Sequence, residues 1–459
     1  MRRAHRRGGG QDGGVKHEPA AANAALVERS LRAVWHPCTQ MKAHERFPLV
    51  PVVEGRGCWL TDAGGRRYLD AVSSWWVNLF GHGEPRIVHA VKAQLDRLEH
   101  VLLAGFTHEP VIQLSERLGT LTGGALGHAF YASDGASATE IALKMSAHFW
   151  RNRGQPGKNR FLCLAGGYHG ETLGALGVTD VPLFRDAYEP LLRAAATLPS
   201  PDWRAAAPGE DAAAVAQRAA LALEQHLEAH AASTAAIIVE PLVQCAGGMA
   251  MHHPDYLARV RALCDRFEVH FIADEIAVGF GRTGTLFAHE QAGVRPDLLC
   301  LSKGITGGFL PLSVVLSSDS LYAAFYDDHT ARGFLHSHSY TGNPLACAAA
   351  LAVLDIFRDD DVIQANRVRA SAFDALAQPL REDERVRHFR RSGMIWAFDV
   401  AGAPPGFARR YAEAALAEGA LIRPLGDTVY FMPPYVMEAK EFALLVRAAR
   451  RALDSALEA

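Results

Sequence analysis

Lys303 is the residue of this sequence whose surroundings most suggest covalent chemistry. It follows the apolar run Leu298–Leu301, separated from it only by Ser302, and precedes Gly304. A lysine amine that is buried in apolar surroundings has a lowered pKa and forms Schiff bases with carbonyl groups. Lysine is usually a solvated surface residue, but a position between an apolar run and a glycine-rich stretch favours the buried role.

Asp274 ends the preceding apolar run, which begins at Val269. A carboxylate beneath a pyridine ring keeps the ring nitrogen protonated, and a protonated ring accepts electrons from a carbanion. Taken alone, an aspartate at a strand end is more often a helix cap or the partner of an arginine. The chemical interpretation of Asp274 therefore depends on its combination with Lys303.

The turn Ser133–Ser137 reads Ser-Asp-Gly-Ala-Ser and lies between an expected strand and an expected helix. Small residues leave backbone N–H groups free and a helix start attracts negative charge, so a phosphate group fits there. Such turns are common, and this one alone is weak evidence. Together with the aspartate and the lysine, it predicts a site for pyridoxal phosphate (PLP), bound to Lys303 as a Schiff base.

Tyr168 lies in the glycine-rich stretch Gly166–Gly170 and could present its ring to the cofactor, although an isolated aromatic residue is more often part of a core. The sequence has no nucleophile-elbow or Walker motif. Four histidines lack a convincing metal-ligand spacing: His252, His253, His336 and His338. We therefore expect no metal site.

The elements that must position these residues alternate between short apolar runs and helical stretches. We expect strands at His128–Ser133, Phe161–Leu164, Ala236–Glu240, Val269–Ile276, Leu298–Leu301 and Ser313–Leu316. This alternation predicts an α/β fold with a mostly parallel central sheet covered on both faces. Ligands of such sheets bind at the carboxyl ends of the strands, where the candidate residues lie.

The two ends of the chain are expected to form one small α+β domain. The N-terminal part has a hairpin-like stretch, Pro51–Leu69, and an amphipathic helix near 85–99, whereas the C-terminal part has a strand at Met394–Val400 and a hairpin around Gly426-Asp427. Residues 203–235 are Ala-rich with helical periodicity. The expected boundaries are a disordered leader at 1–27, the small domain at 28–95 and 351–459, and a large PLP-binding domain at 96–350.

The composition indicates a globular protein that stays in the cytoplasm. Of 459 residues, 49% are hydrophobic and 21% charged, and the formal charge of −3 argues against nucleic acid as a partner. Seven scattered cysteines fit a reducing compartment better than disulfides. No apolar run is long enough to cross a bilayer. The Arg-rich start could be a transit peptide, but it lacks amphipathic periodicity, which favours the disordered leader.

Longer motifs resemble those of the class III aminotransferases of PLP fold type I. They are Glu275–Gly284, which reads EIAVGFGRTG, the position of Lys303, and Thr341–Ala346, which reads TGNPLA. The resemblance extends from about residue 31 to the C-terminus. It implies a large PLP-binding domain, a small domain made of both chain ends, and a homodimer with active sites at the interface.

Further motifs are similar to the branch of this family that acts in biotin biosynthesis. They are Trp35-His36-Pro37, Ser73–Trp76, Gly167–Gly170 and the stretch from Arg423 to Tyr435. This likeness implies ping-pong transamination, in which the amino group of S-adenosylmethionine passes to the cofactor and then to 8-amino-7-oxononanoate, giving 7,8-diaminononanoate.

The resemblance also implies residue roles. Lys303 would be catalytic, and cofactor binding would fall to Gly135, Ala136, Tyr168, Asp274, Lys303, His338 and Ser339, with Ser339 reaching the phosphate from the partner subunit. Substrate binding would fall to Trp75, Tyr168, Ser337, Arg423 and Tyr430. A guanidinium fork at the end of an aromatic slot suits a long apolar acid, which supports Arg423. Adjacent residues of a strand face opposite ways, so we expect only one of Trp75 and Trp76 to line the site.

Three positions depart from the usual family pattern. Cys38 stands where a tyrosine is usual, Ala136 where a serine is common, and Ser337 where a glycine is common. Because Cys38 removes a phenol from the substrate pocket, an ω-aminotransferase that uses lysine or another amine as donor is the alternative. An aminomutase and a PLP-fold binding protein without activity are further alternatives.

Overall fold

The computed structural model describes residues 19–47 and 49–458 of the chain. Residues 1–18 of the expected leader lie outside the described residues. Helix α1 spans Pro19–Ala33, so the boundary expected after residue 27 falls inside a helix. No helix of the described part is both long and apolar enough to span a membrane.

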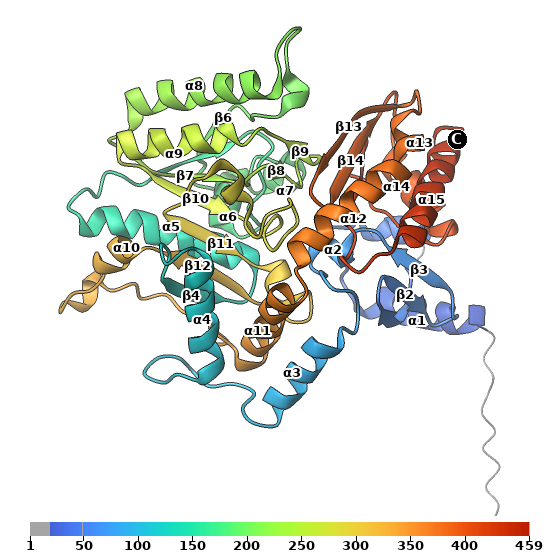
Figure 1. The fold of residues 1–459 in the computed structure, drawn as a ribbon, viewed down its shortest axis with the longest axis horizontal. Helices are drawn as coiled ribbons and strands as arrows, with labels where there is room; N and C mark the ends of the chain where they lie inside the picture. Colours follow the sequence, from blue (N-terminus) through green and yellow to red (C-terminus); the bar gives the residue numbers. More distant parts are fainter. Residues whose placement is uncertain (1–18, 48, 459) are drawn as a thin grey trace, which may run out of the picture.

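A seven-stranded sheet forms the centre of the larger part of the molecule, in the order β4-β12-β11-β10-β7-β5-β6 (Figure 1). Its strands are β4 (His128–Ala132), β5 (Arg160–Leu164), β6 (Ala196–Leu198), β7 (Thr234–Val239), β10 (His270–Asp274), β11 (Leu298–Leu301) and β12 (Ser313–Ser317). Strand β12 is antiparallel to both its neighbours, and the other pairs are parallel. The mostly parallel sheet predicted from the sequence is therefore confirmed.

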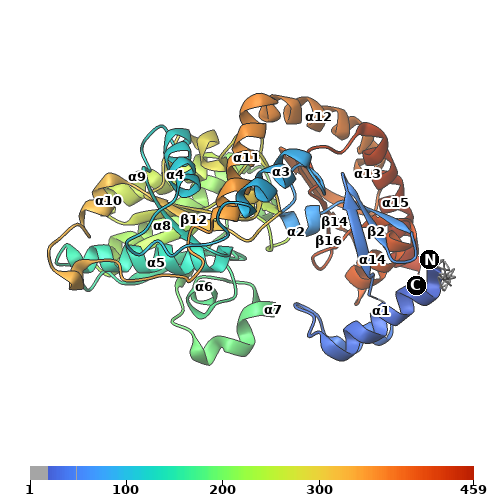
Figure 2. The same cartoon turned by 90° about the horizontal axis from the view of Figure 1, so that it is seen from below.

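Helices cover both faces of this sheet. Phe271 of β10 belongs to a buried cluster that includes α8 (Ala212–His230) and α9 (Asp255–Phe267), whereas the next residue, Ile272, belongs to a second cluster built on α5 (Gly135–Asn152). Figure 2 shows α5 along one face of the sheet. Because both faces of β7 and β11 are buried, these strands read as nearly continuous apolar runs.

The remaining helices connect or flank the sheets. They are α2 (Ser73–Trp76), α3 (Pro85–Leu95), α4 (Glu109–Leu121), α6 (Leu173–Gly177), α7 (Pro182–Arg185), α10 (Asp319–Ala323), α11 (Pro344–Asp359), α12 (Val362–Leu376), α13 (Gln378–Arg381), α14 (Phe407–Ala417) and α15 (Ala439–Glu458). The helix expected near 85–99 is α3. Pro85 occupies its first turn and the Glu84 side chain accepts the N–H of Arg86, as expected for a helix start.

Two smaller sheets join the ends of the chain. One has the order β1-β2-β3-β15 and the other β13-β14-β16. Their strands are β1 (Val52–Arg56), β2 (Trp59–Asp62), β3 (Arg67–Asp70), β13 (Val386–Ser392), β14 (Ile395–Val400), β15 (Ala420–Leu421) and β16 (Thr428–Phe431), and a separate pair consists of β8 (Val243–Gln244) and β9 (Ala250–Met251). The parallel pairing of β15 with β3 ties the C-terminal part to the N-terminal part, as the sequence suggested.

The hairpin expected around Gly426-Asp427 was wrong beyond its turn. Leu425 and Thr428 form an isolated bridge, but β15 and β16 on either side do not pair with each other. Strand β15 pairs with β3, and β16 pairs with β14. The local turn signal was correct, while distant strands determine the pairing.

Candidate active site

Lys303 follows β11 as the first residue of a short 3-10 turn, Lys303–Thr306. Its φ is +46°, a left-handed conformation that few L-residues adopt. The side chain lines a cavity of about 270 Å³, and the surrounding protein lowers the pKa of the amine through desolvation, although Cys245, Asp274 and Glu240 oppose the shift. The arrangement favours a neutral, nucleophilic amine.

Asp274 is the last residue of β10, and its carboxylate is fixed by two contacts. One oxygen accepts the N–H of Ile276 at 3.0 Å, and the other lies 2.7 Å from Nδ1 of His169. Both side chains are buried. His169 lies in the Gly167–Gly170 motif, and the sequence alone gave no role for it. Here it orients the carboxylate that faces the cavity.

The expected phosphate site lies at the start of α5, where the Asp134 carboxylate caps the helix by accepting the N–H of Ser137 at 2.9 Å. At two positions beside this helix start, the close packing leaves room only for glycine. A Cβ on Gly135 would lie 2.9 Å from Ile276, and a Cβ on Gly170 would lie 2.5 Å from that of Ala136. Free N–H groups at the start of an 18-residue helix form an anion site.

These side chains line one cavity, which collects residues from the ends of several strands. Its lining residues are Trp76, Asp134, Gly135, Ala136, Tyr168, His169, Gly170, Glu171, Glu240, Asp274, Ile276, Ala277 and Lys303. An anion-binding helix start, a carboxylate and a lysine amine are the three groups that PLP requires of a protein. The residues present therefore fit this cofactor.

Buried Glu240 and half-buried Tyr168 form a hydrogen-bonded network beside Lys303. The Glu240 carboxylate accepts N–H groups of Tyr168 and Cys245, each at 3.0 Å, and burial raises its pKa to about 7. The Tyr168 hydroxyl donates to Glu171 at 2.9 Å, and Cys38 Sγ lies 3.9 Å from the same oxygen. Glu240 did not stand out in the sequence, because its contacts come from two distant loops.

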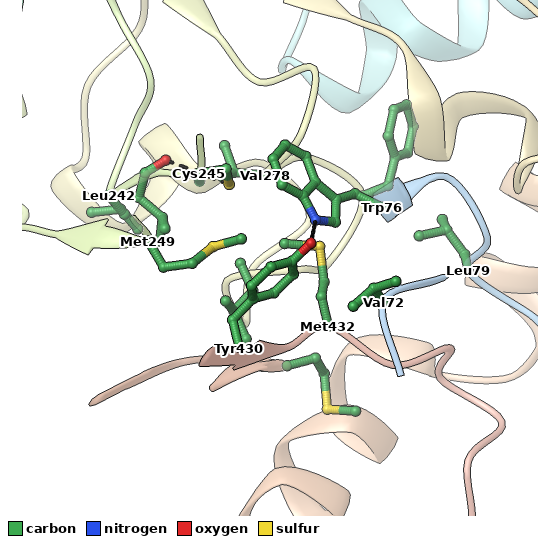
Figure 3. Close-up of a cluster of buried hydrophobic side chains, with 14 of the residues drawn as sticks. Val72, Trp76, Leu79, Leu242, Cys245, Met249, Val278, Tyr430 and Met432 are labelled. Carbon is green, nitrogen blue, oxygen red and sulfur yellow. Dashed lines mark hydrogen bonds between the residues drawn. The ribbon is translucent and has the colours of Figure 1, made fainter. Parts of the chain in front are cut away.

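The two tryptophans do not lie on a strand, which corrects the prediction made for them. Residues Ser73, Ser74, Trp75 and Trp76 have φ values of 50°, 46°, 74° and 73°, so they form one left-handed turn. Trp76 is buried, its ring centroid lies 4.8 Å from Lys303 Nζ, and it donates from Nε1 to the Tyr430 hydroxyl at 3.0 Å. Figure 3 shows this bond within a buried cluster. Trp76 lines the lysine cavity, and Tyr430 lies behind it.

Trp75 lines a second cavity of about 570 Å³ with a largely apolar wall, which also includes Cys38 and Arg423. The guanidinium carbon of Arg423 lies 4.7 Å from the Trp75 ring. Arg423 forms no hydrogen bond or ion pair with another residue of the described chain. The Cys38–Glu171 contact lies between this cavity and the lysine cavity. Both tryptophans therefore border the site, on different sides.

Ser337, His338 and Ser339 line neither cavity of this chain. Ser337 and Ser339 are exposed, and the His338 ring contacts His336, with 3.3 Å between their Nε2 atoms. Just after them, Thr341 donates to the backbone oxygen of Tyr131 at 2.6 Å, which places the segment beside β4. A single chain does not bring these three residues to Lys303.

Comparisons with known proteins agree over nearly the whole chain. The family described as "Aminotransferase class-III" matches residues 40–453. The adenosylmethionine-8-amino-7-oxononanoate aminotransferase of Helicobacter pylori is 44% identical, with 94% of this chain and 98% of that protein covered. The enzyme of the same name from Geobacter sulfurreducens is 40% identical, with 90% and 94% covered.

Solved structures give the same result. The crystal structure of the aminotransferase of that name from Methanocaldococcus jannaschii has a TM-score of 0.88 and 34% identity, and covers 94% of this chain and 99% of its own. A PLP-bound amine transaminase from an uncultivated Pseudomonas species has a TM-score of 0.86 and 34% identity, covering 92% and 98%. An omega transaminase from Thermomicrobium roseum, at 31% identity, has a TM-score of 0.90 and covers 95% and 99%.

Proposed function

The chain belongs to the class III aminotransferase family, and from this premise we propose that it transfers the amino group of S-adenosylmethionine to 8-amino-7-oxononanoate, giving the 7,8-diaminononanoate of biotin biosynthesis. It is a PLP-dependent aminotransferase of fold type I. The names of the relatives at 44% and 40% identity support the choice of substrates. The observation that carries the proposal is Arg423, which has no ionic partner among the described residues and borders a large apolar cavity next to the lysine cavity.

In the proposed mechanism, residues of the lysine cavity divide the tasks of holding the cofactor, moving a proton and excluding water. Bound PLP supplies an electron sink for negative charge at the substrate Cα. Lys303 would hold the cofactor covalently, and its amine would move the proton at the substrate Cα. Asp274, oriented by His169, would keep the ring nitrogen protonated. The N–H groups of Gly135 and Ala136 would bind the phosphate. Trp76 and Tyr168 wall the cavity and exclude water.

The second cavity would bind the acceptor. Its apolar wall suits a chain of methylene groups, and the guanidinium of Arg423 suits the terminal carboxylate, which it can bind with two parallel hydrogen bonds. Trp75 fixes the guanidinium from one side. Replacing Arg423 by alanine should raise the KM for the oxononanoate by about 100-fold, as loss of a charge-assisted pair predicts. Arg409→Ala, which changes another arginine of the same cavity, is the matched control.

We infer that the active enzyme is a homodimer in the cytoplasm. The exposed position of Ser337 and Ser339 outside the cavities of their own chain supports contact with a partner subunit. Large apolar side chains nearby are also exposed, among them Leu335 at 78% and Tyr340 at 64%. Such exposure is typical of protein interfaces. Seven free thiols suit a reducing compartment.

The donor assignment is tested by adding S-adenosylmethionine to the purified enzyme without any acceptor. Loss of the visible absorbance band of the Lys303-bound cofactor would support S-adenosylmethionine as donor. Subsequent addition of the oxononanoate should restore the band and give the diamine. A band that responds to lysine or another amine and not to S-adenosylmethionine would overturn the assignment. That result would favour the ω-aminotransferase alternative, which Cys38 in the second cavity and the transaminase neighbours support.

A further inference from the structure

The turn that carries Trp75 and Trp76 has an unfavourable backbone. Four consecutive residues are left-handed, and none of them is glycine. The turn is closed by hydrogen bonds from the N–H of Trp76 to Val72 and from the N–H of Val77 to Ser73, at 2.8 and 3.0 Å. L-residues avoid a left-handed helical turn because Cβ approaches the following carbonyl oxygen. The surrounding structure must therefore hold this turn in place.

Asp70 makes the contacts that are specific to this conformation. It is the last residue of β3 and has no exposed surface. One carboxylate oxygen accepts the N–H of Ser74 at 2.9 Å, and the other accepts the Ser74 hydroxyl at 2.7 Å. Nε2 of His82 lies 3.1 Å from the second oxygen. Both oxygens thus bind the middle of the turn, while His82 fixes the carboxylate from outside.

Apart from the contacts of the two indole rings with Arg423 and Tyr430, other elements hold the two ends of the turn. The Ser73 hydroxyl donates to the backbone oxygen of Met432 at 2.7 Å, and the buried guanidinium of Arg282 donates to the backbone oxygen of Asn78 at 2.9 Å. These bonds fix where the chain enters and leaves. They do not select the left-handed conformation of Ser74, so this selection falls to Asp70.

We propose that Asp70 is the positioning residue of the active site. By holding Ser74 in the left-handed turn, it directs Trp76 towards Lys303 and Trp75 towards Arg423 at the same time. Asp70 itself lines neither cavity. A single carboxylate therefore sets the walls of both cavities, and its loss displaces both tryptophans together. The part of this inference that concerns the oxononanoate rests on the proposed function.

Asp70→Asn tests the proposal, with Asp62→Asn as the matched control. Asparagine keeps the size of the side chain but leaves only one oxygen to accept both bonds from Ser74. Asp62 is also a buried aspartate at a strand end of the same sheet, and it accepts N–H groups of Gly64 and Arg66, both at 2.9 Å. It makes no contact with the tryptophan turn.

We expect Asp70→Asn to lower kcat/KM for the oxononanoate by about tenfold or more, mainly through KM, because small displacements of binding groups have effects of this size. The near-UV circular dichroism of the cofactor-free protein should change as well, because the two indole rings lose their fixed environment. Asp62→Asn should change neither quantity. Kinetic values are normalised to the cofactor content of each variant.

If Asp70→Asn does not fold, Ser74→Ala decides, because it removes only the hydroxyl bond to Asp70. Folded variants at Asp70 or Ser74 with the KM and the tryptophan spectrum of the parent enzyme would overturn the proposal. Equal effects of Asp62→Asn would overturn it too. Should the enzyme aminate another ketone, the proposed function fails, while the spectrum and the KM for that ketone still test the role of Asp70.

Discussion

Lys303 combines two features that are unfavourable for an ordinary lysine, a left-handed backbone and an amine enclosed by protein. Desolvation lowers the pKa of this amine below its usual value near 10.5. Without the cofactor, the folded protein therefore carries an amine that would bind a proton more readily after unfolding. The residue that performs the chemistry is expected to lower the stability of the empty protein.

Replacing Lys303 with methionine should abolish turnover, with a loss of more than about 1000-fold. In the cofactor-free proteins, the variant should unfold at a higher temperature than the parent enzyme at pH 7. Because the unfolded state binds the extra proton, this difference should shrink as the pH rises past 10.5, above which the amine is neutral in both states. Thermal unfolding at several pH values measures it. A difference that does not vary with pH would contradict the argument.

At the residue scale, the sequence was informative for several side chains that end or follow a strand, although it missed Glu240 after β7 and Asp70 at the end of β3. Lys303, Asp274 and Gly135 could be singled out because strand ends converge, and they do line one cavity. His169 and Trp76 could not, since their partners lie far away in sequence. The orientation of the tryptophan turn depends on a carboxylate and on packing, which no local propensity encodes.

At the scale of elements, the loop after Lys303 packs directly against the exit of the tryptophan turn. Gly308 has a φ of +86°, and a Cβ at this position would lie 3.0 Å from the backbone atoms of Asn78 and Val77. Backbone atoms cannot move aside as a side-chain end does. The lysine loop and the tryptophan turn are therefore in contact through a position that only glycine fills without a clash.

Gly308→Ala should lower the free energy of unfolding by at least about 3 kcal/mol and reduce activity, because backbone strain and overpacking add. Gly209→Ala is the control, since Gly209 has a φ of +87° but no atom within 4 Å of the added Cβ. That change should cost only about 1 kcal/mol and leave kcat unchanged. Urea unfolding measures the stability of the two variants, and steady-state kinetics measures their activity. Equal losses of stability in the two variants would show that backbone strain alone, without overpacking, accounts for the effect.

His270 links β10 to α5 and should contribute to the loss of stability in acid. Its Nδ1 lies 2.9 Å from the Ser146 hydroxyl, its ring packs on Phe149 and Trp150, and burial lowers its pKa to about 4. Since the unfolded value is near 6.5, the unfolded state binds more protons, and the stabilisation present above pH 6.5 is lost as the pH falls to about 4.

His270→Asn should therefore flatten the dependence of stability on pH in this window by up to about 3 kcal/mol. The measurement is the free energy of unfolding of the parent enzyme and the variant at pH 7.5, 6, 5 and 4. Parallel curves for the two proteins would mean that His270 does not titrate as its environment indicates. The variant is expected to be less stable at every pH because packing is lost. Such a uniform decrease does not test the titration of His270.

Among the elements, strands buried on both faces were the easiest to predict. The bounds of β11 are those expected, because an apolar run of four residues between turn signals leaves little choice. The two-residue strand β15 and the pairing of β16 could not be predicted, since partners from distant parts of the chain determine them. Pattern reasoning locates elements and turns, and it leaves the pairing of short strands open.

At the scale of the whole molecule, the large sheet lies beside the smaller sheets (Figure 1). The lysine cavity takes residues from both parts, since Trp76 lines it together with Lys303. The large sheet carries Lys303, Asp274 and the start of α5, whereas Trp75 and Arg423 follow β3 and β15 of a smaller sheet. The pairing of β3 with β15 holds these two residues together. Cofactor groups and proposed substrate groups thus belong to separate structural units.

The proposed dimer can be tested with hybrids of two inactive variants. Lys303→Ala removes the catalytic amine, and Ser339→Asp places a negative charge at the proposed phosphate contact of the partner subunit. In a hybrid dimer, one site receives Lys303 from one chain and Ser339 from the other, both intact. Dissociation and re-association of an equal mixture should restore roughly a quarter of the parent activity. No recovery, despite hybrid formation, would place Ser339 outside the partner's site.

Cys38 allows site-specific chemical labelling of the protein without mutagenesis. All seven cysteines are free, and Cys38 is the exposed one, while the other six are buried. It borders the cavity that also contains Arg423 and Trp75. A thiol-reactive dye should therefore label the folded enzyme at one position, slowly near neutral pH because burial raises the pKa of this thiol. A ligand in the cavity would shield the thiol, so the labelling rate alone reports whether the pocket is filled.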